Sequence, residues 1–338
     1  MIRPFGCAFC ILMLALTGCN QDDPNANCPP ESDVLDRFTT DKEYLLTVNG
    51  KAYVREAGGC TFLLDYFPAT FADNYRAADG EIFTRAGELP IKTVRSLTED
   101  FEKATRYTDL FITSPATLNR NWTDVVLQSP LSPTVPEYVA LRKCLIESTC
   151  DFKDNRIDLI QNIGGRPGNS LRFTAVAPSA QMVTSKASIE NTLCHADADD
   201  EVVIEADFFI EKGFPFSLFD FENKWFNESP GPRLVFRNSN QLAVELKYGT
   251  KPDYRQPPGS EQAFPTGRWV RVKVSYVLKS DFTGSIRVWQ DNMLIIDQTG
   301  KTLPTSNSIQ TSLEMGITAT STSTVLYMDN LSFTVNRR

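Results

Sequence analysis

Charged side chains recur at intervals of two or four residues along four segments with strand-like composition. Successive side chains of a strand point to opposite faces, so each set shares one face of its sheet, with apolar residues on the other. The alternating charged residues are Asp220, Glu222 and Lys224; Arg233 and Arg237; Glu245 and Lys247; and Arg271 and Lys273. Acidic and basic groups on one face can make the hydrogen bonds that hold a sugar, which predicts a carbohydrate-binding face. A solvated sheet face that binds nothing shows the same alternation, so both interpretations remain open.

An aromatic residue extends this pattern. Trp289 and Arg287 alternate with two apolar residues on another strand-like segment. An indole in this position is either a core residue or a platform on which a sugar ring stacks. We expect Trp289 to lie on or beside the charged face, with Arg287, Lys247 and Glu245.

Acid–base candidates are few. The chain has one histidine, His195, in a segment that reads as a turn, and Tyr254 lies in a proline-rich loop. Either residue could transfer a proton, and Lys247 could do so from the charged face. A lone histidine is more often structural than catalytic, and a loop tyrosine more often packs over a sheet edge.

No cofactor is expected from the motifs. The acidic run that begins at Asp197 has Val202 where a calcium-binding EF-hand loop needs glycine and Phe208 where it needs glutamate, although another Ca²⁺ site remains open. Beyond Cys7 and Cys10 of the N-terminal apolar run, the chain has no CxxC pair, and only His195 could offer an imidazole, so a zinc site is not expected. The net charge of −8 argues against a nucleic-acid partner.

The elements that must position these residues are mostly strands. From about residue 170 onward, ten strand-like segments follow one another between Gly, Pro, Asn and Ser residues. This spacing predicts an all-β fold, a two-sheet antiparallel β-sandwich or jelly roll. The upstream region adds a hairpin signal at Asn49-Gly50 and capping boxes that predict short helices from Ser96 and from Thr134.

The N-terminus predicts export. The segment "MIRPFGCAFCILMLALTGCN" has one basic residue, an apolar run too short to span a bilayer comfortably, and small residues before Cys19. It resembles the bacterial lipobox, in which the cysteine after the cut is acylated. The resemblance implies a lipid anchor on Cys19 and a place in the cell envelope, and the following Asn20 favours the outer membrane. We expect a signal peptide over residues 1–18, a tether over 19–35 and a small β-rich region of unknown role over 36–107.

An exported chain can form disulfides. Cys144 and Cys150 cannot bridge within one continuous helix, because six residues would separate them by about 9 Å. If they pair, the helix must end between them. Cys28 with Cys60 is the natural second bridge, which leaves Cys194 as a buried free thiol.

The chain from about residue 156 resembles the heparin lyase I-like polysaccharide lyases, within the concanavalin A-like lectin and glucanase superfamily. The resemblance is carried by "GNSLRFTAVAPSAQMVTSKASIEN", "PGPRLVFRNSNQLAVELKYG", "FPTGRWVRVKVSYVLKSDFTGSIRVWQDNMLIID" and "STVLYMDNLSF". With "NWTDVVLQSP" as a first strand, it implies a jelly-roll domain over residues 108–338. It also implies a monomer whose concave face binds an acidic polysaccharide and cleaves it by β-elimination.

By position, "SKASIE" implies roles in substrate binding for Lys186 and Glu190. The chain departs from the family where relatives place a Gln and a His on a central strand, since it has "FDFENKW" with Asp220 and Glu222 there. Two alternatives to a lyase therefore stay open: a carbohydrate-binding lipoprotein without catalysis, and a structural envelope protein.

Overall fold

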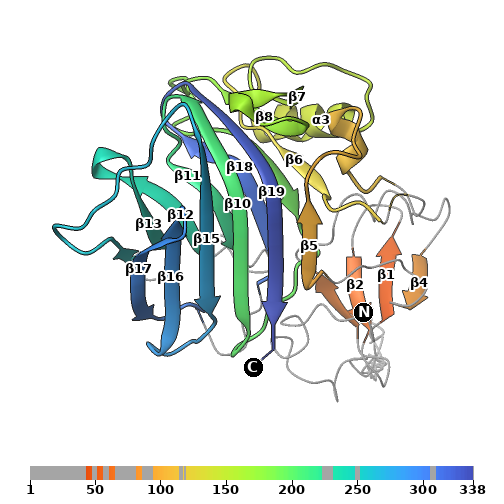
Figure 1. Cartoon of the computed structure of the whole chain (residues 1–338). Helices are drawn as coiled ribbons and strands as arrows, with labels where there is room; N and C mark the ends of the chain where they lie inside the picture. The colour runs from red at the N-terminus through yellow and green to blue at the C-terminus, as the bar shows by residue number, and fades with distance from the viewer. Residues whose placement is uncertain are drawn as a thin grey trace, which may run out of the picture.

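The computed structural model describes the strands of residues 43–85 without their side chains, and then residues 94–113, 117, 119–222, 231–247, 252–304 and 310–337. Two antiparallel sheets make up most of this part of the chain (Figure 1). They confirm the prediction of an all-β, two-sheet sandwich. Each of the ten expected segments contains a strand.

The eight-stranded sheet has the order β17-β16-β15-β10-β19-β8-β7, and β5 also pairs with β19. Its strands are β5 (Ser96–Glu99), β7 (Arg156–Gln161), β8 (Asn169–Ala175), β10 (Glu201–Lys212), β15 (Trp269–Val277), β16 (Gly284–Gln290), β17 (Met293–Gly300) and β19 (Thr324–Asn336).

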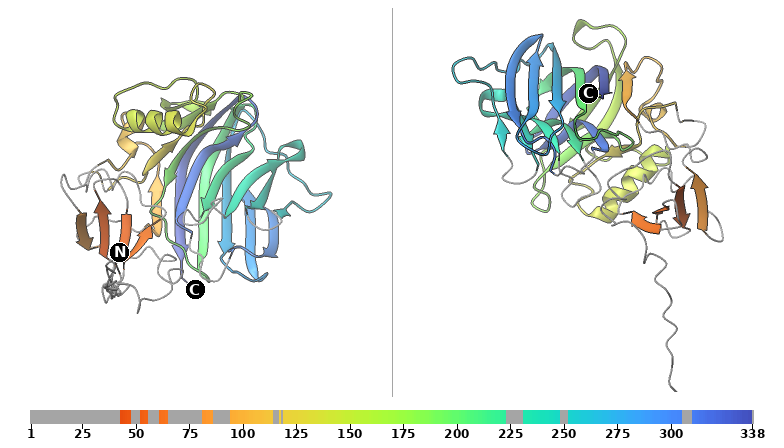
Figure 2. Two further views of the ribbon diagram at one scale, coloured as in Figure 1. Left: turned by 180° about the vertical axis from the view of Figure 1, so that it is seen from behind. Right: turned by 90° about the horizontal axis from the view of Figure 1, so that it is seen from below.

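The seven-stranded sheet has the order β14-β13-β12-β11-β18-β9-β6. Its strands are β6 (Asp124–Val126), β9 (Ser185–Asn191), β11 (Ser217–Glu222), β12 (Pro232–Arg237), β13 (Gln241–Leu246), β14 (Asp253–Tyr254) and β18 (Ser312–Thr320). Figure 2 shows the same two layers from behind and from below.

The core lies between the sheets and follows the period of two. On β15, Val270, Val272 and Val274 are buried while the residues between them are partly exposed. The rings of Phe221 on β11 and Phe333 on β19 lie 5.7 Å apart and join the two sheets. Burial of these apolar faces is the main term that stabilises a sandwich, and it fixes which face of each strand points outward.

Helix α3 (Val135–Ile146) confirms the second expected helix, with the capping box between Thr134 and Glu137. A disulfide joins Cys144 to Cys150 with their Cα atoms 5.4 Å apart, and the helix ends between them as the geometry requires. Cys194 is a buried free thiol, as expected.

Three short 3₁₀ helices, Tyr107–Leu110, Ile163–Gly165 and Asn238–Asn240, complete the helical elements of the described residues. None of the helices described is long and apolar enough to cross a membrane.

The helix expected from Ser96 is wrong, because these residues form strand β5. Leu97 pairs with Phe333 of β19 and is buried. Phe101 has a φ of 59°, which a right-handed helix cannot contain. The carboxylate of Glu99 accepts hydrogen bonds from the Phe101 N–H and from Asn121 instead of capping a helix. Tertiary pairing has overridden the local capping signal.

A four-stranded antiparallel sheet precedes the sandwich in the chain. Its order is β3-β2-β1-β4, with β1 (Glu43–Thr47), β2 (Ala52–Arg55), β3 (Thr61–Leu64) and β4 (Glu81–Arg85). β1 and β2 pair as the hairpin signal predicts, although Asn49 and Gly50 lie outside the described residues. Cys19, Cys28 and Cys60 also lie outside them.

Candidate functional site

A charged row crosses the outer face of the seven-stranded sheet. Each of the seven strands contributes one residue, and neighbours in the row are register partners. We call this set the ionic row, which runs Asp253, Glu245, Arg233, Asp220, Glu314, Glu190 and Asp124. Residues on either side of the row in sequence, such as Leu234, Phe219 and Met315, are core residues, so the row faces away from the core.

Three carboxylates gather at the centre of the ionic row. Those of Asp220, Glu222 and Glu314 have oxygens within 4.8 Å of one another. Lys247 contacts Glu222 and lies 3.5 Å from Asp220, while Lys186 lies 3.3 Å from Glu314. Burial strongly disfavours the ionised form of a carboxylate unless a cation lies nearby. Here two lysines compensate part of the charge of the three buried carboxylates.

Burial raises the pKa of Asp220 to about 6. Lys247 opposes this rise, whereas the neighbouring carboxylates of Glu222 and Glu314 add to it. Asp220 therefore changes its protonation state near neutral pH, as a proton-transfer group must.

An aromatic ring covers the next part of the row. The guanidinium groups of Arg233 and Arg237 lie 4.7 and 4.9 Å from the centroid of the Phe216 ring, and both contact Glu245. Arg237 also bonds Asp253 at 2.7 Å, a hydrogen bond that raises the pKa of Arg237. Phe216 is 36% exposed, so one aromatic surface remains open beside two cations.

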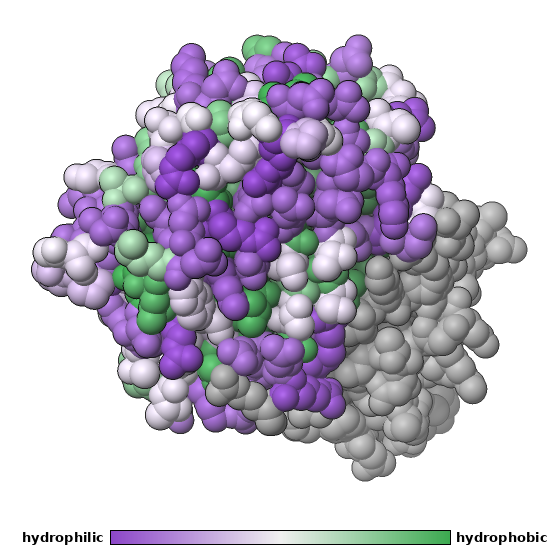
Figure 3. All heavy atoms as spheres, in the orientation of Figure 1, coloured by the Kyte–Doolittle hydropathy of each residue, from purple (hydrophilic) through white to green (hydrophobic). Residues whose placement is uncertain are grey.

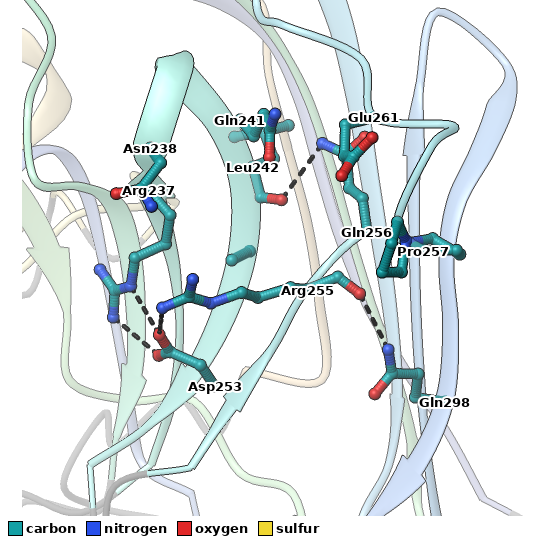
Figure 4. Close-up of a pocket in the computed structure, with 12 residues that line it drawn as sticks. Arg237, Asn238, Gln241, Leu242, Asp253, Arg255, Gln256, Pro257, Glu261 and Gln298 are labelled. Atoms are coloured by element: carbon teal, nitrogen blue, oxygen red, sulfur yellow. Dashed lines mark hydrogen bonds and ion pairs between the residues drawn. The ribbon is translucent and has the colours of Figure 1, made fainter.

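The row leads into a hollow of about 710 Å³ at the β14 edge (Figure 4). Asp253 belongs to both the row and the hollow, and its ion-pair partners Arg237 and Arg255 also line the hollow. Gln298 reaches the hollow from the other sheet and donates to the Arg255 carbonyl at 2.8 Å. A hollow of this volume can hold a small ligand or a few sugar units.

The lysines and carboxylates at the centre of this face differ in depth. The side chains of Lys186 and Lys247 keep 20% and 19% exposure, while those of Glu314, Asp220 and Glu222 keep 2% each. Over the centre of the row, the groups that meet solvent are therefore mainly cationic. This layering favours an anionic ligand although the whole chain is acidic.

The three central carboxylates offer the oxygen ligands that Ca²⁺ prefers. However, Lys247 contacts two of the three and Lys186 contacts the third. These ammonium groups already bring the positive charge that a metal ion would supply, so the donor set does not require one.

Seven of the residues predicted to bind substrate lie on this face. They are Lys186, Glu190, Asp220, Glu222, Arg233, Glu245 and Lys247. Lys224 lies outside the described residues.

Three others lie on a different surface. Arg271 on β15, and Arg287 and Trp289 on β16, belong to the outer face of the eight-stranded sheet. The expectation that Trp289 shares a face with Lys247 and Glu245 is wrong. Alternation shows which residues share a face of one strand, but it does not show which sheet that strand joins.

The structure brings neither Tyr254 nor His195 to the ionic row. Tyr254 pairs with the buried Val244 and packs against Gly300, and burial raises the pKa of its phenol. His195 is buried and bonds Asp197 at 3.0 Å, away from the row.

Several residues of this face were missed in the sequence. Glu314 is the only charged residue of its strand, a signal that could have found it. Asp124 lies on a strand too short to show alternation. Phe216 and Asp253 give no local signal, because only tertiary pairing brings them to the row.

Comparisons with known proteins find distant structural neighbours. No protein-family model matches the chain, and no curated protein matches it. A solved endo-β-1,4-glucuronan lyase from the fungus Trichoderma reesei is 14% identical over 55% of this chain and 88% of its own, with a TM-score of 0.43. The cellulose-induced protein Cip1 is 13% identical over 72% and 98%, with a TM-score of 0.46. Alginate lyase Aly36B is 11% identical over 72% and 98%, with a TM-score of 0.42. Two of these three are polysaccharide lyases, but identities and scores this low support no assignment of substrate or activity.

Proposed function

We propose that the outer face of the seven-stranded sheet binds a uronate-containing polysaccharide and cleaves it by β-elimination. One observation carries the proposal: at the centre of the ionic row the side chains of Lys186 and Lys247 keep 20% and 19% exposure, while the three carboxylates that they contact keep 2% each. The carboxylates of a uronate polymer would meet Lys186, Lys247 and the arginines beside Phe216. The hollow at the β14 edge would take further sugar units.

The reaction assigns separate roles to the two lysines. Lys186 neutralises the uronate carboxylate, which acidifies the proton on the adjacent carbon. A base removes this proton, the C–C double bond forms, the C–O bond to the leaving sugar breaks, and an acid protonates the leaving oxygen. Lys247 contacts Asp220 and Glu222, so a proton can pass between its amine and these carboxylates, and we assign proton transfer to this group.

Product formation tests the proposal. The mature chain is incubated with polygalacturonate, alginate and glucuronan, and the absorbance of the unsaturated product is followed. We expect turnover of one polymer, reduced at least about 100-fold in Lys247→Met and Lys186→Met. Tyr254→Phe should retain turnover, because Tyr254 faces the core side of β14. Turnover that depends on Tyr254 and not on the lysines would place the reaction elsewhere.

A binding protein without catalysis is the second candidate. It is favoured because the two other acid–base candidates, the imidazole of His195 and the phenol of Tyr254, lie away from the row. Calorimetric binding of a uronate oligosaccharide with flat absorbance traces would select this alternative. Absence of binding to all three polymers would reject both candidates.

We also propose that a lipid on Cys19 holds the protein at the membrane, on the strength of the lipobox resemblance. In cells that process lipoproteins, Cys19→Ser should move the protein from the membrane fraction to the soluble fraction. Equal membrane recovery of both forms would contradict the anchor.

A further inference from the structure

A second hollow, of about 240 Å³, lies on the outer face of the eight-stranded sheet, the face seen in Figures 1 and 3. This face is largely polar. Five residues line the hollow: Glu205, Arg271, Lys273, Trp289 and Asn292. None of them belongs to the ionic row, which faces outward from the other sheet.

Trp289 presents an open aromatic surface there. It is partly exposed, and in the described part of the chain its indole N–H has no hydrogen-bond partner. Its cross-strand neighbour Lys273 places the ammonium 5.3 Å from the ring centroid. On the other side, Leu294 of β17 is 46% exposed and widens the apolar surface.

Trp269 provides an internal comparison, because it lies on the same outer face as Trp289 but on the neighbouring strand β15. Arg166 stacks on its ring at 4.2 Å, and its indole N–H donates to the Ile163 carbonyl at 2.9 Å. The two indoles therefore differ at the N–H: that of Trp269 is bonded within the protein, whereas that of Trp289 bonds none of the described residues, although each ring has a cation near it.

The two cations of the hollow, Arg271 and Lys273, also differ in whether they form ion pairs within the protein. Arg271 bonds Glu205 at 2.7 Å and Asp207 at 3.2 Å, so its charge is compensated. Lys273 forms no ion pair with a residue that the structure describes, because its register partner Glu205 bonds Arg271. The hollow therefore combines a cation outside any ion pair with a partly exposed indole, and Asn292 adds a polar side chain.

We infer that this hollow binds a sugar unit that carries a carboxylate. The apolar face of the sugar ring stacks on Trp289, its carboxylate pairs with Lys273, and its hydroxyl groups bond Glu205 and Asn292. The protein would then hold an acidic polysaccharide on both outer faces, once at the ionic row and once here. The ligand class follows the proposed function, but the residues are separate, so each site can be tested alone.

Indole N–H resonances of the ¹⁵N-labelled mature chain test the inference. The Trp289 resonance is identified by its absence in Trp289→Phe, and the Trp269 resonance likewise. On titration with a galacturonate or mannuronate trisaccharide, the Trp289 resonance should shift while that of Trp269 stays in place. Lys273→Met should weaken this binding about tenfold, and maltotriose, which has no carboxylate, should bind at least as weakly to the unaltered protein.

A stationary Trp289 resonance at saturating trisaccharide, or equal binding of maltotriose, would overturn the inference. Lys186→Met separates it from the proposed function. A Trp289 shift that persists while Lys186→Met leaves binding and turnover unchanged would retain the second site and reject the ionic row. Loss of all binding in Lys186→Met with no Trp289 shift would do the opposite.

Discussion

Lys247 lies between two buried carboxylates, those of Asp220 and Glu222. A buried carboxylate is tolerated when a cation and hydrogen bonds compensate it, and Asp220 also accepts a bond from Thr318 at 3.2 Å. The ammonium of Lys247 therefore compensates the charges of both Asp220 and Glu222, and it is the most exposed group of the three. Stability and binding are coupled at this position.

Replacement of Lys247 by Met should be costly. The change keeps the side-chain length but leaves two buried carboxylates without their shared cation, so we expect the free energy of unfolding to fall by on the order of 3 kcal/mol. Urea unfolding at neutral pH measures this. The matched control is Lys273→Met, whose loss should be below about 1 kcal/mol, because Lys273 contacts only an exposed ring. Equal losses in the two variants would contradict the role of Lys247.

Asp220 makes stability depend on pH. Its pKa is raised to about 6 in the folded protein, mainly by burial, from an ordinary value of 3.8. Between these two values the folded state binds more protons than the unfolded state, so this group favours folding below about pH 4 and loses that contribution as the pH rises to about 6.

The Asp220→Asn variant isolates this term, since its side chain does not titrate. The free energy of unfolding of the variant, relative to the unaltered protein, should rise between pH 4 and pH 7 by on the order of 3 kcal/mol, for a shift of about two pH units. Urea unfolding of the variant and of the unaltered protein, each at pH 4 and pH 7, measures the four free energies of unfolding that this comparison needs. A relative stability that does not change with pH would show that the folded pKa is ordinary.

At the scale of the element, strand pairing decides where each side chain acts. The alternation on β11, β12 and β13 correctly predicted which residues share a face, because the apolar face of each strand packs against the core between the sheets. The same pattern on β15 and β16 was equally clear but belongs to the other sheet. In the β5 segment the local sequence signal itself was misleading, because the residues of the expected capping box form a strand that pairs with β19.

Helix α3 gives a prediction at this scale. The Cys144–Cys150 disulfide closes a short loop just beyond the last turn. Replacement of both cysteines by serine should lower the free energy of unfolding by about 2 kcal/mol, as expected for a loop of this length. Thermal unfolding of the oxidised and the double-serine proteins measures the difference. An unchanged midpoint would show that the bridge does not constrain the unfolded chain.

At the scale of the whole molecule, the sequence patterns were sufficient for the fold class and for three residues of the ionic row, Asp220, Arg233 and Glu245, while Glu190 came from the family resemblance. Period-two patterns and turn residues are local, so they could be read without coordinates. The order of strands across each sheet is not local, and this order brings Glu314 between Asp220 and Glu190 and sends Trp289 to the opposite surface. The result is a sandwich with charged groups on two outer faces instead of one.

The location of a bound uronate oligosaccharide tests the central claim most directly. A crystal structure of the protein with a tetrasaccharide of the preferred polymer should show sugar units across β11, β12 and β13, with carboxylates at Lys186, Lys247 or Arg233 and a unit in the hollow beside Arg255. A tetrasaccharide bound only at other surfaces, with the ionic row unchanged and in contact with solvent, would contradict the account.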